Sequence, residues 1–205
     1  MTYFDLTHTL SKDTPVSPYD DKILFQHTKN IARDGYNDTQ ITTTMHIGTH
    51  IDAPSHMIDN AKYIDKFPID KFFGQGIVLN YKDEKLLTVK PEFVKLDFND
   101  KIVLLYTDED KTIGSDEYYK NHPIISEELC DFLIEKQIKM IGLDFFSPDQ
   151  FPSIIHKKFL SEDILIIENL CNLDQLLGVN HFEVILLPIK IKAEGAFIRA
   201  VARTT

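Results

Sequence analysis

The sequence predicts a mixed α+β fold of the α/β class, formed by one domain that spans residues 1–205. Short apolar runs rich in β-branched residues predict eight or more strands, whereas helical periodicity occurs in only two or three segments. These elements do not alternate strictly between strand and helix, so a purely parallel sheet is not expected. The length suits one domain, and no internal repeat or low-complexity linker divides the chain.

The first half of the chain is predicted to be mainly strand. Alternation or continuous apolar runs mark these segments, and clusters of Pro and Asp separate the first two of them. The segment from Pro91 to Leu96 predicts one or two helical turns, because proline is tolerated at the start of a helix. Strands are expected within residues 3–10, 23–25, 35–44, 76–81 and 102–107.

The second half adds the predicted helices. Ser126 is suited to cap a helix that runs to about Lys139. Glu127 and Glu128 in its first turn interact favourably with the positive end of the helix dipole. A second helix is expected at residues 154–160 and a short one at 174–177. Further strands are expected at residues 140–146, 164–167, 184–188 and 197–202.

Composition excludes several classes of function. The 43% of hydrophobic residues can form a sizeable core, and the formal charge of −10 argues against nucleic acid or an anionic membrane as partner. Cys130 and Cys171 are isolated, so no disulfide framework is expected. No signal-like segment and no 18-residue apolar run is present, which predicts a cytoplasmic protein.

Three of the eight histidines fall within eleven residues, together with an aspartate. Imidazole and carboxylate groups are ligands of first-row metals. A straight strand would hold the first and last of these side chains too far apart for one ion, and a regular helix would turn the aspartate away. The segment must therefore bend, most easily at Gly48 and Pro54, which predicts a metal site on a loop or strand end. The four candidate ligands are His46, His50, Asp52 and His56.

Two further candidates lie in the second half. Glu168 follows four aliphatic residues of an expected buried strand, where an ionised carboxylate is costly unless it is paired or bound to metal. His156 lies twelve residues earlier, in the helix before that strand. Each also has an ordinary structural explanation. Their assignment to a functional site is favoured only if the first cluster binds metal. The sequence contains no nucleophile elbow, phosphate-binding loop or dinucleotide fingerprint that would compete with this assignment.

The motif from His46 to His56 resembles the signature of the cyclase-like metal hydrolases, a family that includes bacterial kynurenine formamidases and isatin hydrolases. The resemblance extends over nearly the whole chain and in family order. It continues through Gly142-Leu-Asp144-x-x-Ser147-Pro148, His156, Leu165-Ile166-Ile167-Glu168-Asn169-Leu170 and Gly195-Ala196-Phe197-Ile198-Arg199.

The resemblance implies a swivelling β/β/α fold and a homodimer or higher homo-oligomer. It implies that His46, His50 and Asp52 are the principal metal ligands. His56, His156 and Glu168 match positions that complete a second metal site or serve acid–base chemistry. One or two divalent ions are expected per chain, with Zn²⁺ the leading candidate and Mn²⁺ the alternative.

The expected activity is metal-dependent hydrolysis of a small aryl amide, with N-formylkynurenine, converted to kynurenine and formate, as the leading substrate. His56 is the expected proton shuttle, because its ordinary pKa near 6.5 suits neutral pH. Glu168 and His156 either hold a second ion or protonate the leaving amine. The alternatives are a cyclic-amide hydrolase of the isatin type, another cyclase or dehydratase reaction, and a metal-binding protein without activity.

The chain departs from the family at one loop. Formamidases of this kind often carry Thr-Gly-Trp after the strand that here ends at Thr107, whereas this chain has Asp108-Glu109 and contains no Trp. If that loop lines the substrate pocket, the identity of the substrate is put in doubt. The aromatic wall of a pocket must come from Phe and Tyr.

Overall fold

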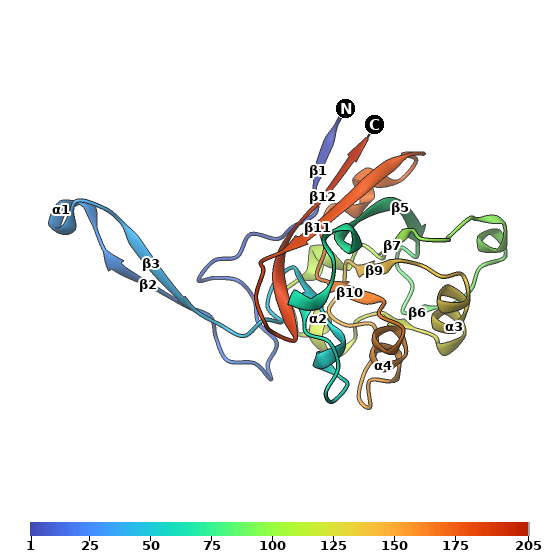
Figure 1. The fold of residues 1–205 in the computed structure, drawn as a ribbon, viewed down its shortest axis with the longest axis horizontal. Coiled ribbons are helices and arrows are strands. Elements are labelled where there is room, and N and C mark those ends of the chain that lie inside the picture. Colours follow the sequence, from blue (N-terminus) through green and yellow to red (C-terminus); the bar gives the residue numbers. More distant parts are fainter. Residues whose placement is uncertain (205) are drawn as a thin grey trace.

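The computed structural model describes residues 1–204 and is built around an eight-stranded sheet with helices packed on its outer face (Figure 1). The predicted mixed α/β class is confirmed. The strands of this sheet are β1 (Tyr3–Asp5), β4 (His50–Asp52), β5 (Phe73–Asn80), β7 (Ile102–Tyr106), β9 (Met140–Leu143), β10 (Leu165–Glu168), β11 (Phe182–Pro188) and β12 (Gly195–Thr204).

The sheet closes on itself through β4. Its order is β1-β12-β11-β5-β7-β9-β10-β4, and β4 also pairs with β12. The strands β5, β7, β9 and β10 are parallel to one another, whereas β4, β11 and β12 pair with their neighbours in antiparallel fashion. The mixed sheet agrees with the absence of strict strand–helix alternation in the sequence.

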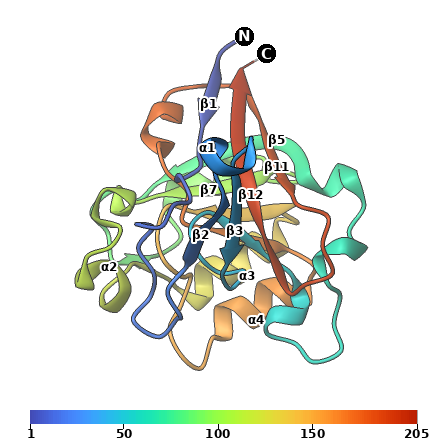
Figure 2. The same cartoon turned by 90° about the vertical axis from the view of Figure 1, so that its left-hand side faces the viewer.

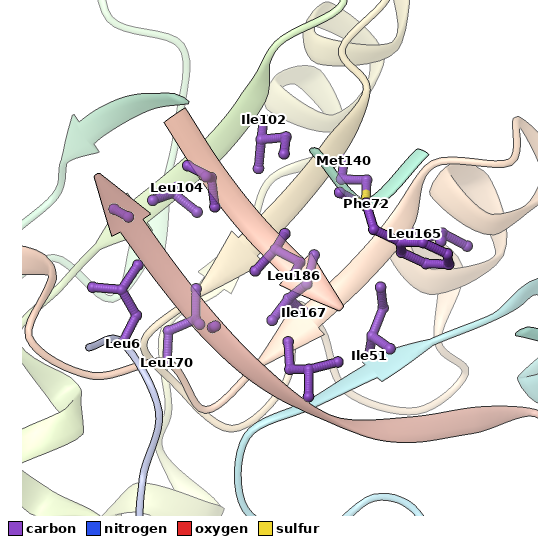
Figure 3. Close-up of a cluster of buried hydrophobic side chains, with 14 of the residues drawn as sticks. Leu6, Ile51, Phe72, Ile102, Leu104, Met140, Leu165, Ile167, Leu170 and Leu186 are labelled. Carbon is purple, nitrogen blue, oxygen red and sulfur yellow. The ribbon is translucent and has the colours of Figure 1, made fainter. Parts of the chain in front are cut away.

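The parallel strands β7, β9 and β10 are buried on both faces, which explains their continuous apolar runs, whereas β5 is only partly buried. Along β7, Ile102 and Leu104 point into the closed sheet, while Val103 and Leu105 face the helices outside. Figure 3 shows the inner cluster, where β7, β9, β10, β4 and β11 each contribute aliphatic side chains. The outer core lies between the sheet and the helices α3 (Glu127–Glu135) and α4 (Ile154–Ser161).

Helix α3 begins where the sequence predicts and ends sooner. The Ser126 hydroxyl accepts a hydrogen bond from the Leu129 N–H at 3.1 Å and caps the helix. The predicted continuation to Lys139 is wrong, because Gln137 has a φ of +56°, in the left-handed region that ends helices. No helix within residues 1–204 is long and apolar enough to cross a membrane.

The remaining helices are short. They are α1 (Ile31–Asp34), α2 (Asp116–Lys120) and the 3₁₀ segments Pro54–His56, Ile64–Lys66, Ile69–Phe72, Pro91–Lys95, Glu109–Thr112 and Leu173–Leu176. The chain thus contains more helical segments than the two or three that periodicity predicts, since single turns are too short to produce a repeating pattern.

Strands β2 (Leu24–Lys29) and β3 (Asp38–Thr42) form an arm that projects from the body, with α1 at its tip (Figure 1). In Figure 2 the arm points toward the viewer. Most of its residues are exposed, including Leu24 and Ile41. The short strands β6 (Leu86–Leu87) and β8 (Ile124–Ile125) form a separate parallel pair.

Candidate metal centre

Successive side chains of β4 point to opposite faces of the sheet, which separates its ligand candidates from the core. Ile51 packs inside the closed sheet, so His50 and Asp52 point to the outer face. In the antiparallel neighbour β10, Glu168 lies directly opposite His50, on the same outer face. Helix α4 packs against β10 there and carries His156. The fold therefore brings the two halves of the predicted site together.

The predicted bend of the motif is present. Gly48 has a φ of +64°, where a side chain would be strained, and Pro54 opens the 3₁₀ turn Pro54–His56. These two turns on either side of β4 bring the rings of His46 and His56 into a stack with centroids 3.9 Å apart. The segment from His46 to His56 is thus a bent loop and strand end, as its spacing requires.

The other five predicted residues surround Asp52. Two groups each offer three ligand atoms within 4.8 Å of one another, His46 with Asp52 and His56, and His50 with Asp52 and Glu168. The His156 Nε2 atom lies 3.3 Å from Glu168 Oε1 and 3.9 Å from Asp52 Oδ2. The geometry therefore divides the ligand candidates differently from the trio of His46, His50 and Asp52 that the resemblance implies, with Asp52 shared between two groups.

The donor set fits a divalent metal ion. Four buried side-chain atoms of the centre have no hydrogen-bond partner, although burial without a partner is costly. Nitrogen and carboxylate oxygen donors at one point are the chemistry that Zn²⁺ or Mn²⁺ requires. The four atoms are His46 Nε2, His50 Nε2, Asp52 Oδ2 and Glu168 Oε1. The remaining oxygen, Asp52 Oδ1, lies 2.8 Å from His46 Nδ1.

The electrostatics of the centre favour positive charge. Burial lowers the pKa of His50, but the carboxylates of Asp52 and Glu168 outweigh it and raise that pKa to about 10. Burial raises the pKa of Asp52, and the neighbouring His50 and His46 bring it well below its usual value. A field that holds protons on buried imidazoles also attracts a cation, which would replace those protons. Burial lowers the pKa of His56, which favours its neutral form.

Asp149 orients His156 and was missed by the sequence reasoning. Its Oδ1 atom lies 2.6 Å from His156 Nδ1, and its Oδ2 atom accepts hydrogen bonds from the backbone N–H groups of Ile155 and His156. Burial lowers the pKa of His156, but Asp149 and Glu168 raise it to about 10. Because Nδ1 is engaged by Asp149, the Nε2 atom is the one turned toward the centre. In the sequence, Asp149 is marked only by its position shortly before the helix expected at residues 154–160.

Two other residues lie beside the centre, and no sequence pattern places them there. The Glu194 carboxylate lies 3.6 Å from His46 Nε2. A Cβ atom on Gly195 would come within 3.0 Å of the His46 ring, so a glycine is needed where β12 passes this histidine. Both residues come from the distant end of the chain, and their approach depends on the pairing of β12 with β4.

A cavity of about 640 Å³ opens onto the centre. His46, His56, His156 and Glu168 are among its lining residues. Its aromatic wall comes from Phe and Tyr, as expected for a chain without Trp. The aromatic lining residues are Tyr19, Tyr119, Phe146 and Phe151.

The acidic loop that departs from the family does not line this cavity. Asp108 pairs with Lys82 at 2.9 Å, Glu109 pairs with Lys85, and the Asp110 carboxylate accepts a hydrogen bond from the backbone of Asn172. These acids are engaged in the body of the protein, so the departure at this loop does not bear directly on the lining of the cavity.

Comparisons with known proteins find relatives that match over most of this chain. A curated relative, kynurenine formamidase of Bacillus mycoides (strain KBAB4), is 26% identical over 98% of this chain and 97% of its own length. An uncharacterized protein of Methanocaldococcus jannaschii is 36% identical over 82% of this chain and 84% of its own. The solved structure of isatin hydrolase A from Labrenzia aggregata, bound to benzyl benzoate, superposes with a TM-score of 0.86 at 27% identity, covering 98% of this chain and 93% of that one.

The family model described as "Putative cyclase" matches residues 4–150, which include the motif from His46 to His56. The match covers well over half of the chain, and relatives and solved structures of the same fold cover almost all of it. The chain therefore belongs to the cyclase family.

Proposed function

We propose that this protein hydrolyses a small aryl amide and that N-formylkynurenine, converted to kynurenine and formate, is its substrate. The observation that carries the proposal is the convergence of six ligand and acid–base candidates, four of which line a cavity that is also lined by aromatic side chains. Such a cavity can hold an aromatic ring while it presents a carbonyl group to the polar side.

The coarser statement, that the chain is a metal-dependent amidohydrolase, is confirmed by the comparisons. A relative matched over 98% of this chain is named kynurenine formamidase, and a solved structure with the same fold is named isatin hydrolase A. The choice of N-formylkynurenine follows the first of these names, and it is the part of the proposal that needs an assay.

His46, His50, Asp52, His56, His156 and Glu168 would hold one or two divalent ions. A bound divalent ion supplies Lewis-acid polarisation of the carbonyl group and lowers the pKa of water to near 7. We favour Zn²⁺ because four of the six candidates are imidazoles, and Mn²⁺ is the alternative because two are carboxylates.

The side chains of the centre would move the protons. His56 lines the cavity and its pKa is lowered by burial, so in the reaction it accepts a proton from the attacking water. Water adds to the formyl carbon, the carbon–nitrogen bond breaks, and a proton passes to the leaving amine from His156 or Glu168. His156 suits this role because Asp149 holds its ring in place.

Two alternatives remain in the proposal. A cyclic-amide hydrolase of the isatin type is favoured by the structural likeness to isatin hydrolase A, and another cyclase or dehydratase reaction would use the same centre. A metal-binding protein without activity is disfavoured, because a purely structural site is closed by its ligands whereas this centre opens to a cavity.

The test is metal content of the purified protein, followed by formate release from N-formylkynurenine with and without chelator. One or two metal ions per chain and chelator-sensitive formate would support the proposal. Bound metal without formate would refute the formamidase assignment, and ring opening of isatin would then be measured. Protein that binds no divalent metal would contradict the whole assignment.

We also propose that the protein is a homodimer or higher homo-oligomer in solution. The arm carries the exposed apolar residues Leu24, Ile31, Tyr36 and Ile41 on a two-stranded hairpin, which is marginally stable when nothing covers it. Light scattering of the purified protein tests this directly, and a monomeric mass would refute it. Nucleic acid and membranes are not proposed as partners, and a cytoplasmic location stays a prediction.

A further inference from the structure

A hydrogen-bond network lies behind His50, on the side away from the carboxylates of the centre. His50 Nδ1 is 2.8 Å from the backbone carbonyl oxygen of Gly48. A carbonyl oxygen only accepts hydrogen bonds, so His50 Nδ1 must carry the hydrogen. The Nε2 atom is therefore the nitrogen that faces Asp52 and Glu168, at 3.4 Å from each. The orientation of His50 thus depends on the position of one carbonyl group.

Asn169 holds that carbonyl group. Its side-chain amide donates a hydrogen bond to the same Gly48 oxygen at 3.1 Å, and its backbone carbonyl accepts one from the Thr49 hydroxyl at 2.6 Å. Asn169 directly follows Glu168 and has a φ of +55°, in the left-handed region. Asparagine and aspartate tolerate this left-handed conformation better than most residues.

Tyr118 fixes the other end of the Asn169 amide. The Tyr118 hydroxyl donates a hydrogen bond to Asn169 Oδ1 at 2.5 Å, and the tyrosine is fully buried. Both polar atoms of the amide are thereby engaged, so it has one orientation. Tyr118 belongs to α2, and the next residue, Tyr119, lines the cavity. The network therefore connects the wall of the cavity with the back of His50.

We propose that Asn169 and Tyr118 are positioning residues for metal binding, which act by holding the Gly48 carbonyl that orients His50. Neither residue lines the cavity, so neither touches the substrate. Outer partners of this kind fix the ring orientation of a metal-binding histidine, and their removal typically costs ten- to a hundredfold in metal affinity. The inference rests on the proposed function, since it takes His50 as a ligand.

The experiment compares two variants with a matched control. Tyr118→Phe removes only the hydroxyl group, and Asn169→Asp keeps the size and the left-handed conformation but sets an acceptor against the Gly48 oxygen. Tyr81→Phe is the control, because Tyr81 is equally buried and its hydroxyl donates to the Thr88 carbonyl at 2.6 Å, away from the centre. Zinc affinity is measured by competition with a chromophoric chelator.

We expect zinc affinity to fall about tenfold in Tyr118→Phe and about a hundredfold in Asn169→Asp. The Tyr81→Phe control should lose a similar amount of thermal stability and bind zinc as the wild type does. A second measurement uses the metal-free proteins, where NMR detects the His50 Nδ1 proton. Its exchange with solvent should be faster in Tyr118→Phe than in the wild type and unchanged in the control.

Wild-type zinc affinity in a folded Tyr118→Phe protein would overturn the inference, as would an equal loss of affinity in the Tyr81→Phe control. If Asn169→Asp fails to fold, Tyr118→Phe decides the question alone. The proton-exchange measurement separates this inference from the proposed function. If the wild type bound no zinc, the proposed function would fail, while unchanged proton exchange in Tyr118→Phe would refute the positioning role by itself.

Discussion

Replacing Asp149 by Asn tests how His156 is oriented. The asparagine oxygen can keep the two hydrogen bonds from the backbone N–H groups of Ile155 and His156, so the start of α4 is preserved. Its amide NH₂ group then faces His156 Nδ1, where the Asp149 carboxylate lies 2.6 Å away in the wild type. To accept a hydrogen bond there, the ring must carry its proton on Nε2, which points toward Glu168.

The contacts of Asp149 set the expected losses of stability and zinc affinity in Asp149→Asn. The hydrogen bond to a charged carboxylate, worth about 1.5–3 kcal/mol, is replaced by a neutral one worth about 0.5–1.5 kcal/mol, so stability should fall by about 1 kcal/mol. In addition, the proton on His156 Nε2 blocks that atom as a metal ligand. We expect zinc affinity to fall about ten- to a hundredfold, which corresponds to about 1.4–2.8 kcal/mol.

Chelator competition gives the zinc affinity and urea denaturation gives the free energy of unfolding. Asp131→Asn is a suitable control, because Asp131 pairs with Lys158 at 2.7 Å on the surface of the same region and its loss removes the same charge. If Asp149→Asn binds zinc as tightly as the control does, Asp149 does not set the orientation of a metal ligand and the reasoning fails.

Three further predictions concern other parts of the molecule. Gly195→Ala should weaken zinc binding at least about tenfold, because the new Cβ would lie 3.0 Å from the His46 ring; unchanged affinity would mean that the ring moves without cost. His56→Ala should lose most formate release while keeping at least one zinc ion per chain, and an unchanged kcat would remove His56 from the mechanism. Burial raises the pKa of Asp144 to about 7, despite hydrogen bonds from Thr107 that favour the ionised form. This value lies above that of the unfolded chain, so stability falls as pH rises from about 4 to 7. Asp144→Asn should remove this dependence, a difference of up to about 4 kcal/mol above pH 7, and parallel stability curves for the two proteins would contradict it.

The strands predicted best from the sequence are those buried on both faces. Mainly aliphatic runs form two of these strands, Ile102–Tyr106 and Leu165–Glu168. Short runs of this kind are typical of buried strands. The end of α3 was predicted wrongly, because the residues up to Lys139 keep helical spacing while Gln137 leaves the helical conformation. Local sequence patterns indicate which face of a helix or strand is buried more reliably than they indicate the residue at which it ends.

The candidate site was accessible to sequence reasoning where its residues lie close together. The motif from His46 to His56 concentrates metal-binding types, and Glu168 was noticeable as a charge after a buried run. Asp149 and Asn169 gave no comparable signal, because polar residues next to turns are common and their partners are set by tertiary structure. Closure of the sheet was also out of reach, since it depends on pairing between segments far apart in the chain.

The closed sheet has a consequence for how the protein is made. Strand β4 pairs on one side with Ile166–Glu168 and on the other with Gly195–Phe197, both more than 110 residues later in the chain. A nascent chain that has emerged only to residue 150 already carries His46, His50, Asp52 and His56 but neither partner of β4. Contacts of such long range form late and slow the folding of a domain. Closure of the sheet and assembly of the metal centre therefore both wait until the chain has emerged from the ribosome beyond β12.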